Sequence, residues 1–296
     1  MKFHITHNTE YQYHDPASDS FAELRICPQN SAGQTVFQRE LTIDPAVPAD
    51  RYEDYFGNQV EFFSIPFRHR HLHVSAWAEV ETRPIPKPSI PLEVPVGEAR
   101  QIYNSWQREV FDFLQPSYHV PLGEEIRALR ARFCRSRQSL EEALLELNHW
   151  IFTNFTYRSG STTINTPLHE VLRKRSGVCQ DFSHLMLALL RANQIPARYV
   201  SGYIESHDPT VTDPALVGAA ASHAWVEVFL PGGTWYGLDP TNDQVVGERH
   251  VRVAVGRDYR DVAPLRGTFK GAHRHDLEVI VSVERQPSKP PAAVSR

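Results

Sequence analysis

The spacing of hydrophobic and polar residues changes along this chain, from a pattern typical of strands to one typical of helices. Up to about residue 83, short runs rich in β-branched and aromatic residues alternate with turn-forming pairs such as Asp15-Pro16 and Gly57-Asn58. Runs of this length and spacing are typical of a small antiparallel β-sandwich. We expect its strands over residues 3–13, 21–27, 35–43, 60–65 and 72–81.

A proline-rich stretch follows at residues 84–96. Proline has no backbone N–H to give to a helix interior or a central strand. We therefore expect a semi-rigid linker without helix or strand.

Beyond the linker the apolar period becomes helical. Ser139 and Glu142 have the spacing of a capping box ahead of a helix. A shorter helix is expected to start at Thr166-Pro167 and to end at Gly177. The next begins near Cys179, since the apolar residues that follow it recur at helical spacing.

Strands are then predicted over residues 197–204, 222–230, 235–239 and 277–283. The fold class is α+β. We divide the chain into an N-terminal antiparallel β-sandwich domain (1–83), the linker (84–96), an α+β core (97–286) and a disordered tail (287–296).

The composition limits the partners. With 41% hydrophobic residues and a formal charge of −4, the chain has the content of a globular protein and no basic excess to hold nucleic acid. It shows neither the apolar stretch of a signal peptide nor a run of the roughly 20 apolar residues that span a bilayer. We expect a soluble cytoplasmic protein with no nucleic-acid or membrane partner, and its oligomeric state stays open.

The cysteines point to thiol chemistry. Cys27, Cys134 and Cys179 are odd in number and scattered, which fits neither a disulfide framework nor the paired cysteines of a zinc site. Cys179 would lie at a helix N-terminus, where unpaired N–H groups and the helix dipole stabilise a thiolate and can receive an oxyanion.

A histidine and a carboxylate flank the turn of the predicted hairpin. His223 and Asp239 each lie eight residues from Pro231. Folding there would place them opposite, or nearly opposite, each other on adjacent strands, close enough for a carboxylate to orient an imidazole. Each residue also has a structural interpretation: a small buried thiol, a satisfied histidine, a turn-opening aspartate. On the residues alone both interpretations stay open.

Several ordered segments resemble the bacterial transglutaminase-like proteins. The nucleophile segment is Gly177-Val178-Cys179-Gln180-Asp181-Phe182-Ser183-His184, and further similar segments lie at 195–203, 222–228, 235–242 and 256–264. Asp54-Tyr55-Phe56-Gly57-Asn58 is similar to the β-domain that precedes the core in this branch.

That resemblance, which extends to about residue 286, implies a papain-like, transglutaminase-like α+β core with a Cys-His-Asp triad. It assigns the nucleophile to Cys179, the base to His223 and the orienting carboxylate to Asp239. The thiolate would attack an amide carbonyl of a peptide or protein substrate, and an amine or water would release the resulting thioester. The small, polar rim expected at residues 204–221 favours water.

Other candidates are less well placed. Tyr157 and Gln180 could donate to an oxyanion, although Tyr157 could equally be a packing residue and Gln180 could face solvent. His184 and His207 could be mistaken for the base. His69, His71 and His73 alternate like metal ligands, but no cysteine or carboxylate completes the set and no acidic cluster offers a calcium site, so we expect no metal or cofactor. The alternative function is a non-catalytic module that binds peptides in a transglutaminase-like groove.

Overall fold

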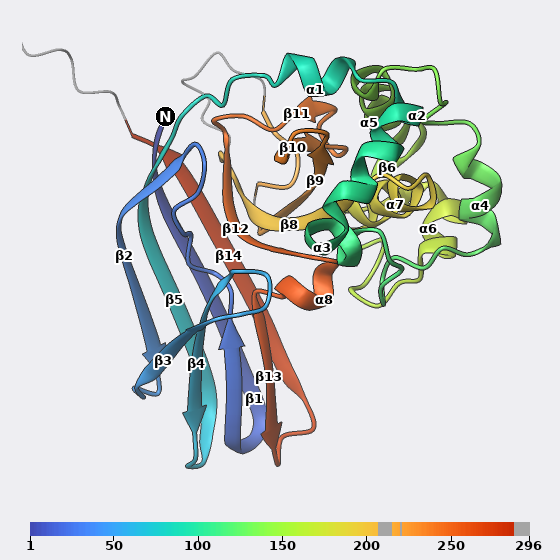
Figure 1. Cartoon of the computed structure of the whole chain (residues 1–296). Coiled ribbons are helices and arrows are strands. Elements are labelled where there is room, and N and C mark those ends of the chain that lie inside the picture. The colour runs from blue at the N-terminus through green and yellow to red at the C-terminus, as the bar shows by residue number, and fades with distance from the viewer. Residues whose placement is uncertain (207–214, 220, 287–296) are drawn as a thin grey trace, which may run out of the picture.

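The computed structural model describes residues 1–206, 215–219 and 221–286 (Figure 1). The tail expected at 287–296 and the candidate His207 lie outside these residues. Within them, no helix is both long and apolar enough to cross a bilayer. The α+β class with an N-terminal antiparallel β-sandwich is confirmed.

One long strand organises the sandwich. β1 (Lys2–Leu24) does not turn at Asp15-Pro16 as expected. Only its pairing with β5 (His69–Thr82) is interrupted between Gln12 and Ala17, where the missing N–H of proline costs no ladder bond. After the interruption β1 changes partners. The other strands of this sheet are β2 (Gln34–Asp44), β3 (Ala49–Glu53), β4 (Gln59–Ile65), β5 (His69–Thr82), β13 (Leu265–Lys270) and β14 (His275–Arg285).

The end of the chain completes the N-terminal sheet. The first part of β1 pairs with β5 and β14, and its last part pairs with β4 and β13. The sequence-based division assigns residues 265–285 to the core at 97–286, whereas β13 and β14 pair with β1 in the N-terminal sheet. An unpaired edge of β1 would expose a row of backbone polar groups, which β13 and β14 satisfy.

The linker holds a short helix, so the expectation of a stretch without regular structure is wrong. α1 spans Ser89–Glu93 and contains Pro91. Proline is tolerated there because the first N–H groups of a helix have no partner inside it.

Helical segments gather on one side of the molecule (Figure 1). α5 begins with the predicted capping box, in which Ser139 accepts a hydrogen bond from the N–H of Glu142. α6 begins one residue later than expected and ends before Gly177, because Arg175 takes the left-handed conformation. The helices before α7 are α2 (Val96–Ile102), η1 (Tyr103–Trp106), α3 (Gln107–Val110), η2 (Phe111–Phe113), α4 (Glu124–Arg130), α5 (Leu140–Asn154) and α6 (Leu168–Lys174).

The second sheet carries the helix that begins at Cys179. α7 (Cys179–Ala192) is buried along nearly its whole length and packs against β8 and β9. The sheet is antiparallel in the order β11-β10-β9-β8-β12. Its strands and the elements beside it are β6 (Thr156–Tyr157), β7 (Ser176–Gly177), β8 (Ala197–Ile204), β9 (His223–Leu230), β10 (Thr234–Asp239), β11 (Gln244–Val245), β12 (His250–Gly256) and α8 (Tyr259–Val262).

The Asp54–Asn58 turn fixes the sandwich to the core. Asn58 is fully buried, and its side-chain amide exchanges two hydrogen bonds of 2.8 Å with the backbone of Val255 in β12. Asp54 holds the turn by accepting from the N–H groups of Phe56 and Asn58. The segment that resembles the bacterial β-domain thus supports the sheet on which His223 lies.

Candidate active site

Cys179 is the first residue of α7. The preceding residue, Val178, donates its N–H to Oδ2 of Asp181 at 2.8 Å, and Thr162 donates to the same oxygen at 2.7 Å. These bonds fix the start of the helix. A side chain at Gly177 would meet Asp181, with Oδ2 only 2.7 Å from its Cβ, so glycine is required for this close approach rather than for ending a helix.

The hairpin of β9 and β10 brings His223 and Asp239 to one place. Leu238 pairs with Val226, so Asp239 lies opposite Trp225, and His223 follows two positions further along on the same face. The expected near-opposition therefore takes the form of a diagonal pair. His223 Nε2 lies 2.9 Å from Asp239 Oδ2, and both side chains are inaccessible to solvent.

The thiol and the carboxylate act on the same ring. Burial lowers the pKa of His223, but the Asp239 carboxylate and the Cys179 thiolate outweigh it and raise this pKa to about 10. Because Nε2 is bonded to Asp239, the nitrogen left for the thiol is Nδ1, which has no other partner among the described residues. The ring of His223 is thereby held as an imidazolium next to Cys179.

Asp239 is held by more than His223. Its Oδ1 accepts from the N–H of Thr241 at 2.9 Å, and its Oδ2 accepts from the side-chain amide of Asn242 at 2.8 Å. Burial raises the pKa of this carboxyl, but the charges and hydrogen bonds of His223 and His250 bring it well below its usual range. Asp239 therefore stays ionised.

His250, the first residue of β12, is a second histidine on this carboxylate. Its Nε2 lies 3.3 Å from Asp239 Oδ2, while its Nδ1 accepts from the N–H of Gly247 at 3.4 Å. Since Nδ1 is an acceptor, Nε2 carries the proton and donates to Asp239. The sequence analysis missed His250, which no local motif marks.

Asn242 connects the carboxylate to the segment that precedes His223. Its Oδ1 accepts from the N–H of Val217 at 2.8 Å, while its amide nitrogen donates to Asp239. The next residue, Gly218, has a φ of +96°, and a Cβ built there would lie 2.9 Å from His223 Nδ1. Asn242 lies within a recognised motif, but its hydrogen bonds were not anticipated.

The two oxyanion candidates lie in different settings. Tyr157 in β6 pairs with Gly177 in β7, so it lies beside the segment that leads into Cys179. Burial and the nearby Cys179 thiolate raise the pKa of its hydroxyl to about 12, so it keeps its proton as a donor must. Gln180 donates one N–H of its side-chain amide to the carbonyl of Ile164 at 3.3 Å, and the second N–H of that amide remains a donor.

The remaining histidines belong to other environments. The ring of His184 accepts from the N–H of Tyr259 and stacks on His119. His69 contacts Ser20, and His71 pairs with Asp44. Across residues 1–206, 215–219 and 221–286, no three His, Cys, Asp or Glu side chains are grouped as metal ligands.

Comparison with known proteins places this geometry in a family. The model of the transglutaminase-like superfamily matches residues 127–240, which include Cys179, His223 and Asp239. The model of the bacterial transglutaminase-like N-terminal region matches residues 3–81. The chain belongs to the transglutaminase-like superfamily.

Relatives of this transglutaminase-like protein extend along its whole length. An uncharacterized protein of Mycobacterium tuberculosis is 41% identical over 295 residues, which cover 95% of this chain and 92% of the relative. A protein-glutamine gamma-glutamyltransferase of Pseudomonas aeruginosa is 35% identical over 129 residues, which cover 43% of this chain and 18% of that enzyme.

A crystal structure supports the same fold. A Cytophaga hutchinsonii protein, provisionally named a cysteine protease, superposes with a TM-score of 0.71 at 23% identity, over 98% of this chain and 93% of its own. The transglutaminase-like α+β core predicted from the motifs is thereby confirmed.

Proposed function

We propose that this protein is a thiol-dependent enzyme that cleaves peptide or side-chain amide bonds through a thioester on Cys179. The observation that carries the proposal is the buried pair of His223 and Asp239, whose Nε2 and Oδ2 atoms lie 2.9 Å apart. Cys179 interacts with the same His223 ring. A merely structural cysteine has no need of an imidazole held in this way.

The residues account for each proton. The Cys179 thiolate attacks the carbonyl carbon, and the protonated His223 gives its Nδ1 proton to the departing amine as the C–N bond breaks. Water, or a second amine, then loses a proton to Nδ1 as it attacks the thioester, and the C–S bond breaks to release the Cys179 thiolate, which restores the starting pair of thiolate and imidazolium. Asp239 stabilises the imidazolium and fixes its orientation without itself titrating.

An oxyanion on the attacked carbonyl would be stabilised at the start of α7. The first N–H groups of a helix have no partner inside it and lie at the positive end of its dipole. The Tyr157 hydroxyl, which interacts with the same thiolate, is our choice for a side-chain donor. Gln180, whose side-chain amide gives one of its two N–H groups to Ile164, is the second candidate.

For the acceptor we favour water, and thus an amidase or peptidase acting on peptides or proteins in the cytoplasm. The test supplies glutamine-containing peptides together with a fluorescent primary amine, and follows both ammonia release and amine incorporation. We expect turnover that Cys179→Ala abolishes and Cys134→Ala retains. Equal turnover in Cys179→Ala would refute the enzyme, and incorporation of nearly every acyl group into the amine would refute hydrolysis alone.

A further inference from the structure

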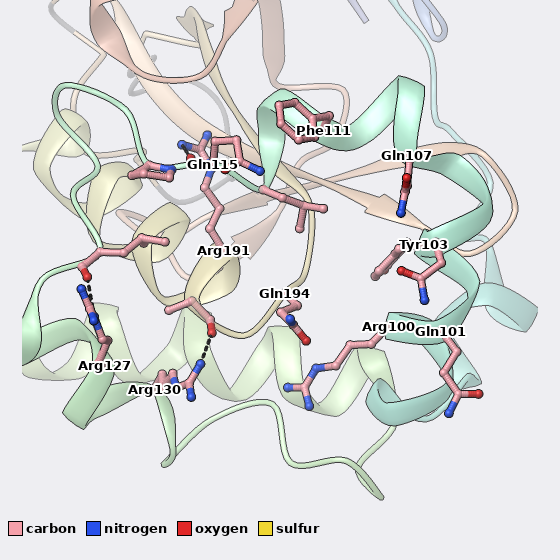
Figure 2. Close-up of a pocket in the computed structure, with 15 residues that line it drawn as sticks. Arg100, Gln101, Tyr103, Gln107, Phe111, Gln115, Arg127, Arg130, Arg191 and Gln194 are labelled. Carbon is pink, nitrogen blue, oxygen red and sulfur yellow. Dashed lines mark hydrogen bonds between the residues drawn. The ribbon is translucent and has the colours of Figure 1, made fainter.

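A large groove lies at the opposite end of α7 from Cys179. Its volume is about 920 Å³, and arginines from three helices line it: Arg100 of α2, Arg127 and Arg130 of α4, and Arg191 in the last turn of α7 (Figure 2). Arg191 lies twelve positions after Cys179 along α7, or about 18 Å at 1.5 Å per residue. The groove is therefore separate from the candidate active site.

The charged side chains that line the groove are all positive. Among the described residues that line it, none is an aspartate or glutamate, and the four arginines bond to carbonyl, amide or hydroxyl oxygens rather than to carboxylates. In contrast, the protein as a whole has a formal charge of −4. A local excess of guanidinium groups in a concave site attracts anions.

One of the four arginines, Arg191, uses its side-chain nitrogens for hydrogen bonds within the protein. Arg191 is only 2% exposed, and each of its three side-chain nitrogens donates to a carbonyl oxygen, those of Gln115, Ala197 and Arg257. It adds positive charge to the wall of the groove but has no N–H to offer a ligand. The proposal rests on the other three.

The remaining arginines keep free donors. Arg100 bonds through Nε and Nη2, Arg130 through Nη1, and Arg127 through Nε alone. Each therefore retains N–H groups without a partner among the described residues. Guanidinium groups with paired free donors match the geometry of phosphate and carboxylate oxygens.

Helix capping accounts for only part of this cluster. Arg130 and Arg100 donate to the carbonyls of Ala192 and Asn193, at the end of α7, where cations are favoured. Arg127 makes no such bond; among the residues that the structure describes, its hydrogen-bond partner is the carbonyl of Leu122. It is thus the arginine whose presence in the groove the capping of α7 does not explain.

We propose that this groove binds a small molecule with at least two anionic groups, phosphate or carboxylate. The volume suits a ligand of metabolite size. Arg100 comes from α2 and Arg127 from α4 (Figure 2), so the groove offers a separate guanidinium to each of two anionic groups. Side-chain amides such as Gln107 and the exposed ring of Phe111 would contact the rest of the molecule.

Isothermal titration calorimetry of the full chain with pyrophosphate, tripolyphosphate and citrate at physiological ionic strength tests this proposal. We expect at least one of them to bind with a Kd below about 1 mM. Preference for the polyphosphates would assign phosphate chemistry, and preference for citrate would assign carboxylate chemistry. No binding by any of the three up to about 10 mM would overturn the proposal.

Two variants each remove one positive charge, one inside the groove and one outside it. Arg127→Gln should weaken binding by about tenfold or more, the size expected for a lost charge-assisted contact. Arg137→Gln, at an exposed arginine that does not line the groove, should leave the affinity unchanged. Equal weakening by both variants would indicate non-specific attraction and contradict the site. Cys179→Ser should bind the anion as the wild type does, so the groove and the proposed enzyme can fail independently.

Discussion

His250 donates a hydrogen bond from Nε2 to Oδ2 of Asp239 at 3.3 Å, and that same oxygen lies 2.9 Å from Nε2 of His223. One carboxylate oxygen thus joins two histidines from separate strands. Both ring nitrogens of His250 have partners, Asp239 and the N–H of Gly247, so we regard it as a positioning residue for Asp239.

This relationship predicts a graded effect at His250. Replacing it by Leu should lower kcat by about tenfold, because Asp239 loses one charge-stabilising donor but keeps His223, Thr241 and Asn242. KM should change by less than about twofold, as uniform substrate binding is untouched. His250→Gln, which retains a donor, should recover part of the rate. A rise in KM alone would show that His250 acts on substrate binding instead.

Thiol reactivity should differ sharply among the cysteines. Burial raises the pKa of Cys27 and of Cys134 to about 12, whereas Cys179 has a helix N-terminus and the His223 ring beside it. Iodoacetamide at neutral pH, followed by peptide mapping, should modify Cys179 well before the other two. Comparable labelling of Cys27 or Cys134 would remove the basis for a reactive thiolate.

The pH profile follows from the raised pKa of His223. The pKa of His223, about 10, lies above the ordinary 6.5, so the ring stays an imidazolium throughout neutral pH and loses its charge as the pH rises through about 10. We expect kcat to fall on that alkaline limb, since a neutral ring cannot donate to the departing amine. A limb centred near pH 7 would mean that Asp239 and Cys179 do not stabilise the charged ring.

Asp239→Asn tests the carboxylate directly. The variant should move the alkaline limb to lower pH and lower kcat by roughly 10²–10³, less than the about 10⁴ of the matching change in serine proteases, because a thiol needs less help from its base. Circular dichroism should show the fold retained. Turnover within about twofold of the wild type would exclude Asp239 from the triad.

Gly218 should be intolerant of a side chain. A Cβ there would lie 2.9 Å from His223 Nδ1, on a backbone with a φ of +96°. Gly218→Ala should therefore displace the ring or the segment and lower kcat/KM by about tenfold or more. Gly123→Ala is the control, since its Cβ would meet only one atom, 3.9 Å away, and φ is ordinary. Equal activity in both variants would contradict the placement of residues 215–219 against His223.

Local patterns in the sequence were enough for the parts of the site that lie on single elements. The start of α7 at Cys179 and the β9–β10 hairpin each follow from apolar spacing and turn residues. His250 could not be found in this way, because it reaches Asp239 through the β12–β8 pairing. The return of β14 to β1 depends on contacts between the two ends of the chain, which no local period encodes. In the linker, Pro91 fits into the first turn of α1, where its missing N–H has no partner to lose. At Asp15-Pro16, pairing with the neighbouring strands keeps β1 extended although proline often ends a strand.

The thioester on Cys179 is the central claim, and mass spectrometry with peptide mapping measures it most directly. The protein is mixed with a library of glutamine-containing peptides, quenched in acid within the first turnover, digested and mapped. We predict an added acyl mass on the peptide that carries Cys179, absent from Cys179→Ala and increased in Asp239→Asn if release of the acyl group becomes the slower step. Amide cleavage without any adduct on Cys179, or an adduct of equal yield on Cys27 or Cys134, would contradict the account.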